Sequence, residues 1–292
     1  MNKALKIVVL AKQVPDTRNV GKDAMTPEGT VNRAALPAIF NPEDLNALEL
    51  ALRLKEECEG STVHILTMGP FRAADIIREA MFRGADGGYL LTDRKFAGAD
   101  TLATSYAISC ALKKIGYDVI IAGRQAIDGD TAQVGPQVAE KLRLPQVTYA
   151  ECVEQVKDSS LVIRRRLERG VEVVECPIPA VVTVNASAPA VRPMNARRIM
   201  KYKYAMTPSE TAADPESARA AMVASRDYLK IAELTVADID TDENQLGFAG
   251  SPTKVKKIEN VVFQAKEAKC MTSADENINE LMVELIASHT LG

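Results

Sequence analysis

The chain has 292 residues, of which 47% are hydrophobic and 26% charged, and its formal net charge is −3. This length and composition fit one large globular α/β domain with an extension, or two modest domains. The sequence lacks the excess of basic residues that is typical of nucleic-acid-binding proteins, so we expect no nucleic-acid partner. No apolar run approaches the roughly 18–20 residues that span a bilayer, so we expect no membrane span.

The first apolar run, residues 6–11, predicts a strand. The basic start before it superficially suggests a signal peptide, but Lys12 follows at once and no small-residue cleavage pattern appears. The five cysteines are scattered and only two histidines exist, which disfavours both a disulfide framework and a zinc site. We therefore expect a cytoplasmic chain without a metal.

Strand and helix patterns alternate along the first half of the chain. Strands are expected at 6–11, 63–67, 89–92 and 118–122, with helices at 42–57, 73–82 and 101–114 and a fourth ending near 142. Asn41 suits an N-cap with Pro42 at the first helical position, and Gly84 suits a helix C-terminus. This alternation predicts an α/β fold with a doubly wound, mostly parallel sheet, whose ligands bind beyond the carboxyl ends of the strands.

The segment 118–142 is the most informative part of this pattern. A buried strand leads into a polar loop that turns at Gly123 and Gly129, and then into a helix that Asp130 or Thr131 can cap. Free N–H groups and the helix dipole at such a junction make an anion site, which suggests a nucleotide phosphate; an ordinary turn is the alternative. Neither G-x-G-x-x-G nor a P-loop occurs, which disfavours a conventional nicotinamide dehydrogenase and a P-loop nucleotidase.

The second half of the chain has a different character. Strands are expected at 160–166, 171–174 and 179–184, and the arginines at 164–166 indicate a solvated edge. Residues 185–198 resemble a functional loop, and 207–225 a linker or a loosely attached helix. A glycine-rich stretch at 246–253 precedes an amphipathic helix at about 273–287, which packs either on a partner chain or back on its own domain.

No pattern in the chain predicts a protein-borne catalytic group. Neither histidine lies near a glycine elbow, and Asp128 and Asp130 fit a turn and a helix cap better than a metal pair. Arg124 could neutralise an anion or stack on a ring. The chemistry is therefore expected to come from a cofactor.

The chain resembles the β subunit of electron-transfer flavoprotein. The residues 122–137 (AGRQAIDGDTAQVGPQ) carry the resemblance most specifically, supported by 9–15 (VLAKQVP), 41–44 (NPED), 179–184 (PAVVTV) and 246–255. The resemblance implies a heterodimer with an α subunit that carries a flavin, and an adenine-nucleotide-binding domain at 1–204. Residues 205–292 would be an insertion and a C-terminal arm that packs on the α subunit.

The family has two branches that differ in the nucleotide of the β subunit. The housekeeping branch holds a structural AMP. The electron-bifurcating branch holds a second FAD that takes a hydride from NADH. It sends one electron through the α-subunit FAD to an acyl-CoA dehydrogenase or reductase-like partner, and the other to ferredoxin or flavodoxin. The segment 92–101 resembles the corresponding loop of the bifurcating branch, which accommodates the flavin half of FAD. Its small residues 97–99 would leave room for a flat ring, so we expect FAD rather than AMP; a capping turn without a ligand is the alternative.

The resemblance also assigns residues to roles. The implied cofactor residues are Leu10, Ala11, Lys12, Asn41, Asp44, Met68, Asp93, Phe96, Ala97, Gly98, Ala99, Asp100, Thr101, Gly123, Arg124, Gln125, Ala126, Ile127, Asp128, Gly129, Asp130, Thr131, Ala132, Gln133, Val134 and Gly135. The loop 185–198 occupies the place of the family's partner-recognition loop. Ala196 stands at or near the family's usual leucine, so Met194 or Val191 becomes the candidate for the hydrophobic plug. A nucleotide-sensing protein without an α subunit is the remaining alternative.

Overall fold

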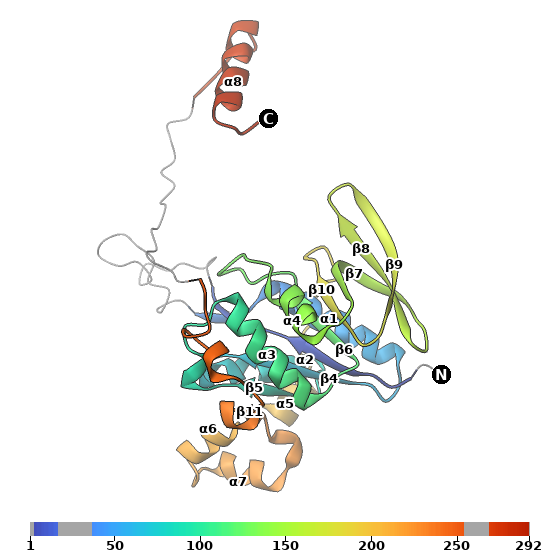
Figure 1. Cartoon of the computed structure of the whole chain (residues 1–292), viewed down its shortest axis with the longest axis vertical. Helices are drawn as coiled ribbons and strands as arrows, with labels where there is room; N and C mark the ends of the chain where they lie inside the picture. Colours follow the sequence, from blue (N-terminus) through green and yellow to red (C-terminus); the bar gives the residue numbers. More distant parts are fainter. Residues whose placement is uncertain (1–2, 17–36, 254–268, 292) are drawn as a thin grey trace, which may run out of the picture. The chain divides into compact units, whose positions relative to one another are not determined.

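The computed structural model describes residues 3–16, 37–253 and 269–291 (Figure 1). The chain divides into two compact units, residues 1–256 and 257–292.

The first unit is built around a nine-stranded sheet with the order β11-β5-β4-β1-β6-β10-β7-β8-β9. Its strands are β1 (Lys6–Leu10), β4 (Thr62–Met68), β5 (Gly87–Leu91), β6 (Val119–Gly123), β7 (Gln146–Val156), β8 (Ser160–Leu167), β9 (Gly170–Pro177), β10 (Ala180–Val184) and β11 (Ala232–Leu234). The pairs from β11 to β7 are parallel, and β7, β8 and β9 pair antiparallel. The predicted α/β fold with a mostly parallel sheet is confirmed.

Helices cover both faces of the sheet (Figure 1). One buried cluster joins Val9 of β1 to α1 (Pro42–Glu57) and α2 (Ala74–Arg83). The other joins its neighbour Val8 to α3 (Thr101–Ile115) and α4 (Val134–Leu142). Because successive side chains of a strand point to opposite faces, an apolar strand of this kind is buried on both sides.

The chain reverses its direction across the sheet at β1. From β1 it proceeds to β4 and β5 on one side, and then returns to β6 on the other side. The helix after β1 covers one face and the helix after β6 covers the opposite face, so the loops at these two strand ends diverge. This arrangement is a topological switch point, which is where ligands bind in open α/β sheets.

Residues 205–253 belong to the first unit. The stretch 207–225, for which we expected a linker or a loosely attached helix, forms α6 (Pro208–Ala213) and α7 (Ala218–Ser225), with Ala220 and Val223 buried. The strand β11 then pairs with β5, followed by the short 3-10 helices η6 (Val236–Asp238) and η7 (Glu243–Gln245). The expected boundary at 204/205 therefore falls inside the first unit.

The antiparallel strands β7, β8 and β9 extend from the parallel part of the sheet (Figure 1). The arginine run lies on β8, which is flanked on both sides, so the prediction of an edge strand was wrong. Arg164 and Arg166 pair with Glu151 of β7, and Arg165 pairs with Glu172 of β9. The edge strand is β9.

Two further parts of the first unit lie outside the nine-stranded sheet. The strands β2 (Gln13–Pro15) and β3 (Ala38–Phe40) pair antiparallel in a separate two-stranded sheet. The expected loop 185–198 is shorter than predicted, because α5 (Ala196–Tyr202) begins at Ala196 and Asn195 caps it by accepting from the N–H groups of Arg197 and Arg198.

The second unit contains α8 (Asp275–Ala287), which confirms the predicted amphipathic helix. None of its residues is buried, and its apolar side chains Ile278, Leu281, Met282, Val283 and Ile286 are exposed. Among the residues that the structure describes, no helix is long and apolar enough to cross a membrane.

Candidate functional site

The loop that follows β6, residues 124–133, lies at the switch point. The helix α4 begins at Val134, so the prediction of a cap at Asp130 or Thr131 was wrong. Asp130 and Ala132 instead adopt left-handed backbone conformations, with φ of 49° and 52°. The Asp130 N–H closes a turn by donating to the Ala126 carbonyl at 2.9 Å. Left-handed backbone at non-glycine residues is uncommon and concentrates at ligand-binding sites.

The N-terminus of α4 presents unpaired backbone donors. Gln137 is the first residue to donate to the carbonyl four positions before it, Gln133, at 2.9 Å. Within the described part of the chain, the N–H groups of Ala132 and Val134 have no hydrogen-bond acceptor. Such groups, together with the helix dipole, favour an anion.

The space in front of this loop is open. Among the described residues, a Cβ atom built on Gly129 would have no heavy atom within 4 Å. The backbone at Gly129 is therefore open to an approaching group on this side.

The side chain of Asn41, at the start of α1, is hydrogen-bonded to the loop after β6. Asn41 occupies the N-cap position of α1 as predicted, but its side chain makes no capping hydrogen bond. Its Nδ2 donates to the Gln125 carbonyl at 2.9 Å, and its Oδ1 accepts from the Ile127 N–H at 3.2 Å. Asn41 is fully buried. Asn41 therefore supports the backbone of the loop at residues 125–127.

Asp44 joins the chain after β1 to the end of β6, the two strands at the switch point. Its Oδ2 accepts from the Lys12 N–H at 2.8 Å, and its Oδ1 accepts from the Gly123 N–H at 3.1 Å. A Cβ atom on Gly123 would lie 2.4 Å from the Asp44 Oδ1, so only glycine permits this close packing. Burial raises the pKa of Asp44 to about 7, against the opposing effect of these N–H donors.

The charged side chain of Arg124, in the loop after β6, is paired with Glu43 of α1. The Arg124 Nη2 lies 2.9 Å from the Glu43 Oε1, and the Gln125 N–H donates to the Glu43 Oε2 at 3.0 Å. The hydrogen bond from Arg124 to Glu43 raises the pKa of the guanidinium. The positive charge of Arg124 is therefore already balanced by the Glu43 carboxylate. Glu43 was absent from the predicted site, although it belongs to the same NPED motif as Asn41 and Asp44.

The two aspartates of the loop point to different partners. Asp128 pairs with the Lys12 ammonium at 2.7 Å, whereas Asp130 accepts from the Gln125 Nε2 at 3.0 Å. Among the described residues, no group of three or more His, Cys, Asp or Glu side chains is arranged to hold a metal ion.

The loop after β5, residues 92–100, adjoins the loop after β6. It contains η4 (Arg94–Phe96), and Asp100 caps α3 as predicted by accepting from the Ala103 N–H at 3.0 Å. The Thr101 Oγ1 donates to the Gln133 Oε1 at 2.8 Å and so links the two loops. The structure thus brings together the two segments that the sequence suggested as walls of one site.

The remaining predicted cofactor residues differ in exposure. Leu10, Ala11 and Phe96 are buried, while Ala97 and Gly98 are exposed at the tip of the loop. Gly98 has φ of +71°, and a Cβ atom built on it would lie 3.3 Å from the Cβ atom of Phe248. The space beside Gly98 that we expected for a flat ring is therefore partly taken by the chain itself.

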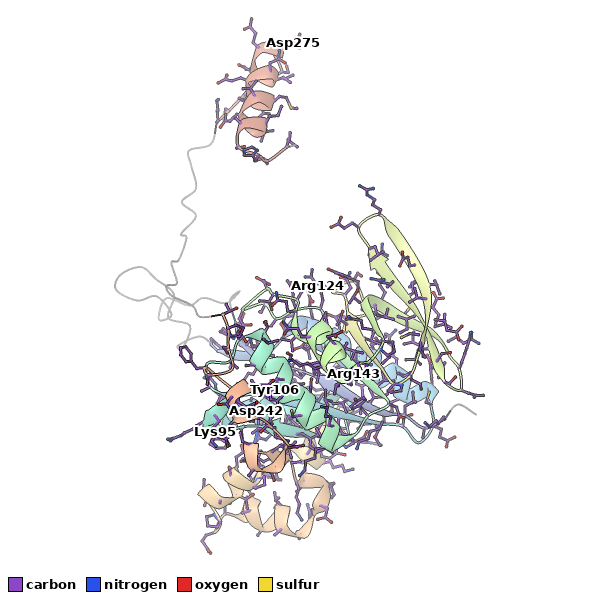
Figure 2. All side chains as sticks on the ribbon, viewed as in Figure 1. Lys95, Tyr106, Arg124, Arg143, Asp242 and Asp275 are labelled. Atoms are coloured by element: carbon purple, nitrogen blue, oxygen red, sulfur yellow. The ribbon has the colours of Figure 1, made fainter. Side chains whose placement is uncertain are left out.

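Sequence reasoning missed the segment 234–253, which packs on the loop after β5. The Asp242 N–H donates to the Tyr106 hydroxyl of α3 at 2.8 Å, and Lys95 forms an ion pair with Glu243. Figure 2 shows Lys95, Tyr106 and Asp242 close together, although they come from three separate parts of the chain. The glycine-rich composition at 246–250 was the available signal for this close packing.

The partner-loop candidates occupy distinct positions. Arg192 anchors the loop to α1, because its N–H and Nε both donate to the Glu49 Oε2 at 3.0 Å. Val191 packs against the core, Ala196 is the first residue of α5, and Met194 is 45% exposed. Met200 on α5 is 65% exposed and was not predicted. Of the three candidates, Met194 alone offers a large apolar side chain to a partner.

Comparison with known proteins identifies the family to which the sequence is similar. A family described as "Electron transfer flavoprotein domain" matches residues 28–215. The electron transfer flavoprotein subunit beta of Thermoanaerobacterium thermosaccharolyticum is 44% identical over 86% of each chain. The acryloyl-CoA reductase electron transfer subunit gamma of Anaerotignum propionicum is 40% identical over 98% of this chain and all of its own. A subunit of the caffeyl-CoA reductase–Etf complex of Acetobacterium woodii, CarD, is 48% identical over 61% of this chain and 68% of its own.

Proposed function

The chain belongs to the electron transfer flavoprotein family, and from this premise we propose that it is the β subunit of an electron-bifurcating heterodimer that binds FAD. The observation that carries the proposal is the pairing of an anion-binding loop after β6 with a small-residue loop after β5, joined by Thr101 and Gln133. The first loop suits the diphosphate, and the second lies where a group attached to it can extend.

We assign the residues of the site to separate tasks. The N–H groups at the start of α4, with Gly129 beside them, would hold the diphosphate. Lys12 and Arg124 supply positive charge that is balanced by Asp128 and Glu43. When bound, FAD would accept a hydride from NADH and pass single electrons onward.

The branch is inferred from relatives as well as from the loop. Two similar proteins carry names that place them with acyl-CoA-type reductases: the caffeyl-CoA reductase–Etf subunit and the acryloyl-CoA reductase electron transfer subunit. By extension, we propose an acyl-CoA reductase or dehydrogenase-like partner for this chain. Ferredoxin or flavodoxin would be the second acceptor.

A structural AMP is the second candidate. It is favoured by one observation, the contact of Gly98 with Phe248, which reduces the space that an isoalloxazine ring would need. Because Ala97 and Gly98 are themselves exposed, the outer surface of the loop is still accessible to a ring, and we retain FAD as the proposal.

Two surfaces are proposed for protein partners. The apolar side of α8 suits the electron-transfer flavoprotein α subunit, because an amphipathic helix is stabilised when its apolar side packs against another surface. Met194 suits the reductase partner, because the loop is held on α1 and leaves this side chain exposed. The cysteines are scattered along the sequence without a disulfide-framework pattern, which fits the proposed cytoplasmic location.

An anaerobic titration with NADH tests the proposal. The heterodimer of this chain with its α subunit is expected to lose flavin absorbance at about one equivalent of NADH. This loss should require the flavin that is bound to the β subunit. A heterodimer whose absorbance is unaffected by NADH, and which releases AMP on denaturation, would favour the second candidate.

A further inference from the structure

The loop after β5 is held by residues far along the chain. The segment 246–253, here called the clasp, lies against residues 95–100. The Phe248 N–H donates to the Ala97 carbonyl at 3.0 Å, and the Thr253 N–H donates to the Asp100 Oδ2 at 3.1 Å. The clasp therefore contacts the loop at its tip and at its end.

Ser251 is the centre of this contact. Its hydroxyl oxygen accepts from the Asp100 N–H at 2.8 Å, and the hydroxyl donates to the Gly247 carbonyl at 2.7 Å. The side chain is 3% exposed. One buried hydroxyl thus connects the backbone that begins α3 to the backbone of the clasp, and water cannot easily replace it.

Gly247 makes this approach possible. It has φ of +52°, and a Cβ atom there would lie 2.2 Å from the Lys95 carbonyl oxygen and 2.9 Å from that of Ala97. Gly250 lets the clasp fold closely on the residue that precedes it, because a Cβ atom there would lie 2.1 Å from the backbone of Gln245. At Gly247 the backbone of the clasp is therefore in direct contact with the loop.

The start of the loop is fixed by neighbouring residues of the same segment. The Thr92 N–H donates to the Leu234 carbonyl at 2.9 Å, and the Val236 N–H donates to the Asp93 Oδ2 at 3.3 Å. Both ends and the tip of the loop are consequently set by residues 234–253. The loop after β6 is held at residues 125–127 by Asn41 and Glu43, and it meets the loop after β5 only at its far end, where Thr101 donates to Gln133 among the described residues.

We propose that Ser251 is a positioning and specificity-determining residue, which fixes residues 97–100 so that the site retains FAD in preference to AMP. This inference rests on the proposed function and extends it. Ser251 lies on the side of the loop after β5, whereas the diphosphate is assigned to the loop after β6, which Ser251 does not touch. Loss of the Ser251 hydroxyl should therefore weaken the hold on the flavin half and leave the adenylate half unchanged.

The test is a competition between the two nucleotides in the intact heterodimer. Wild type, Ser251→Ala and Ser109→Ala are equilibrated with FAD and increasing AMP, and the bound nucleotides are counted after rapid gel filtration. Ser109 is a matched control, because it is 2% exposed and its hydroxyl donates within α3 to the Ser105 carbonyl at 2.7 Å. Ser251→Ala is expected to shift the bound ratio about tenfold toward AMP, with AMP affinity within about twofold of wild type.

Two further outcomes decide against the inference. An unchanged ratio in Ser251→Ala would overturn it, and so would an equal loss of both nucleotides, which marks a purely structural residue. If wild type itself binds only AMP at the β site, the proposed function fails as well. Amide hydrogen exchange separates these cases: residues 98–103 should exchange faster in Ser251→Ala than in Ser109→Ala, and equal exchange would show that the hydroxyl does not fix the loop.

Discussion

Lys12 and Asp128 form an ion pair across the switch point, with the Lys12 Nζ 2.7 Å from the Asp128 Oδ2. Lys12 follows β1 and Asp128 lies in the loop after β6, so the pair connects the two strand ends at the proposed site. The Lys12 side chain is 49% exposed and the Asp128 side chain 23%. A pair this exposed contributes little to stability, but its charges act on any anion that enters.

The two members of this pair should change nucleotide affinity in opposite directions. Lys12→Ala removes a positive charge near the diphosphate and is expected to weaken binding about fivefold, whereas Asp128→Asn releases Lys12 and is expected to strengthen it by a few-fold. Unfolding free energies should change by less than about 1 kcal/mol. Equilibrium binding at low and high salt is the measurement, and weakening by both substitutions would show that the pair is needed intact.

Asp44 should make stability depend on pH. Its pKa is about 7 in the folded chain against an ordinary value of 3.8, so the folded state holds the proton more tightly. Its contribution to stability is complete below about pH 4 and is lost as the pH rises through about 7, with a slope of up to about 1.4 kcal/mol per pH unit.

Asp44→Asn is expected to remove this slope between about pH 4 and 7, as measured by urea unfolding at several pH values. The exposed Asp75, whose side chain is 70% accessible, provides the control Asp75→Asn, which should keep the slope of wild type. An unchanged slope in Asp44→Asn would show that another group causes the pH dependence.

Gly129→Val should weaken nucleotide binding without loss of stability. The built Cβ of Gly129 meets no protein atom within 4 Å, so the valine would occupy the space assigned to a phosphate. We expect at least about tenfold weaker binding. Gly135→Val is the contrasting variant, because its Cβ would lie 2.6 Å from the Thr183 Cγ2 and should lower the unfolding temperature. Wild-type nucleotide content in Gly129→Val would refute the placement of the phosphate.

Met194→Glu should impair electron transfer to the reductase partner while leaving reduction by NADH intact. A charge on the exposed plug would have to be desolvated in an apolar pocket of the partner. Val173→Glu is the control, because Val173 is also exposed, at 55%, but lies on β9. Rates of partner reduction that fall equally in both variants would argue against a specific role for Met194.

The sequence predicted the alternation of strands and helices up to residue 142 because apolar strands buried on both faces give short, unambiguous apolar runs. It did not predict β7, whose burial alternates irregularly along 146–156, or the three-residue strand β11. Both gain their order from neighbouring strands in the sheet, which local patterns do not record.

The site shows the same limit. Asp130 and Thr131 are good N-caps locally, yet α4 begins at Val134 because distant side chains, Asn41 and Glu43, hold the preceding loop. The contact between Asp100 and Ser251 joins residues 151 positions apart. Asn41, Asp44 and the loop residues were predicted as parts of one site, but the division between exposed loops and buried supporting residues became visible only in three dimensions.

The most direct test of the account is the count of flavin and AMP in the purified heterodimer. Denaturation followed by chromatography should release two FAD per heterodimer and no AMP, because we propose that the crevice between β1 and β6 holds a flavin of its own. One FAD per heterodimer together with one AMP would contradict the account.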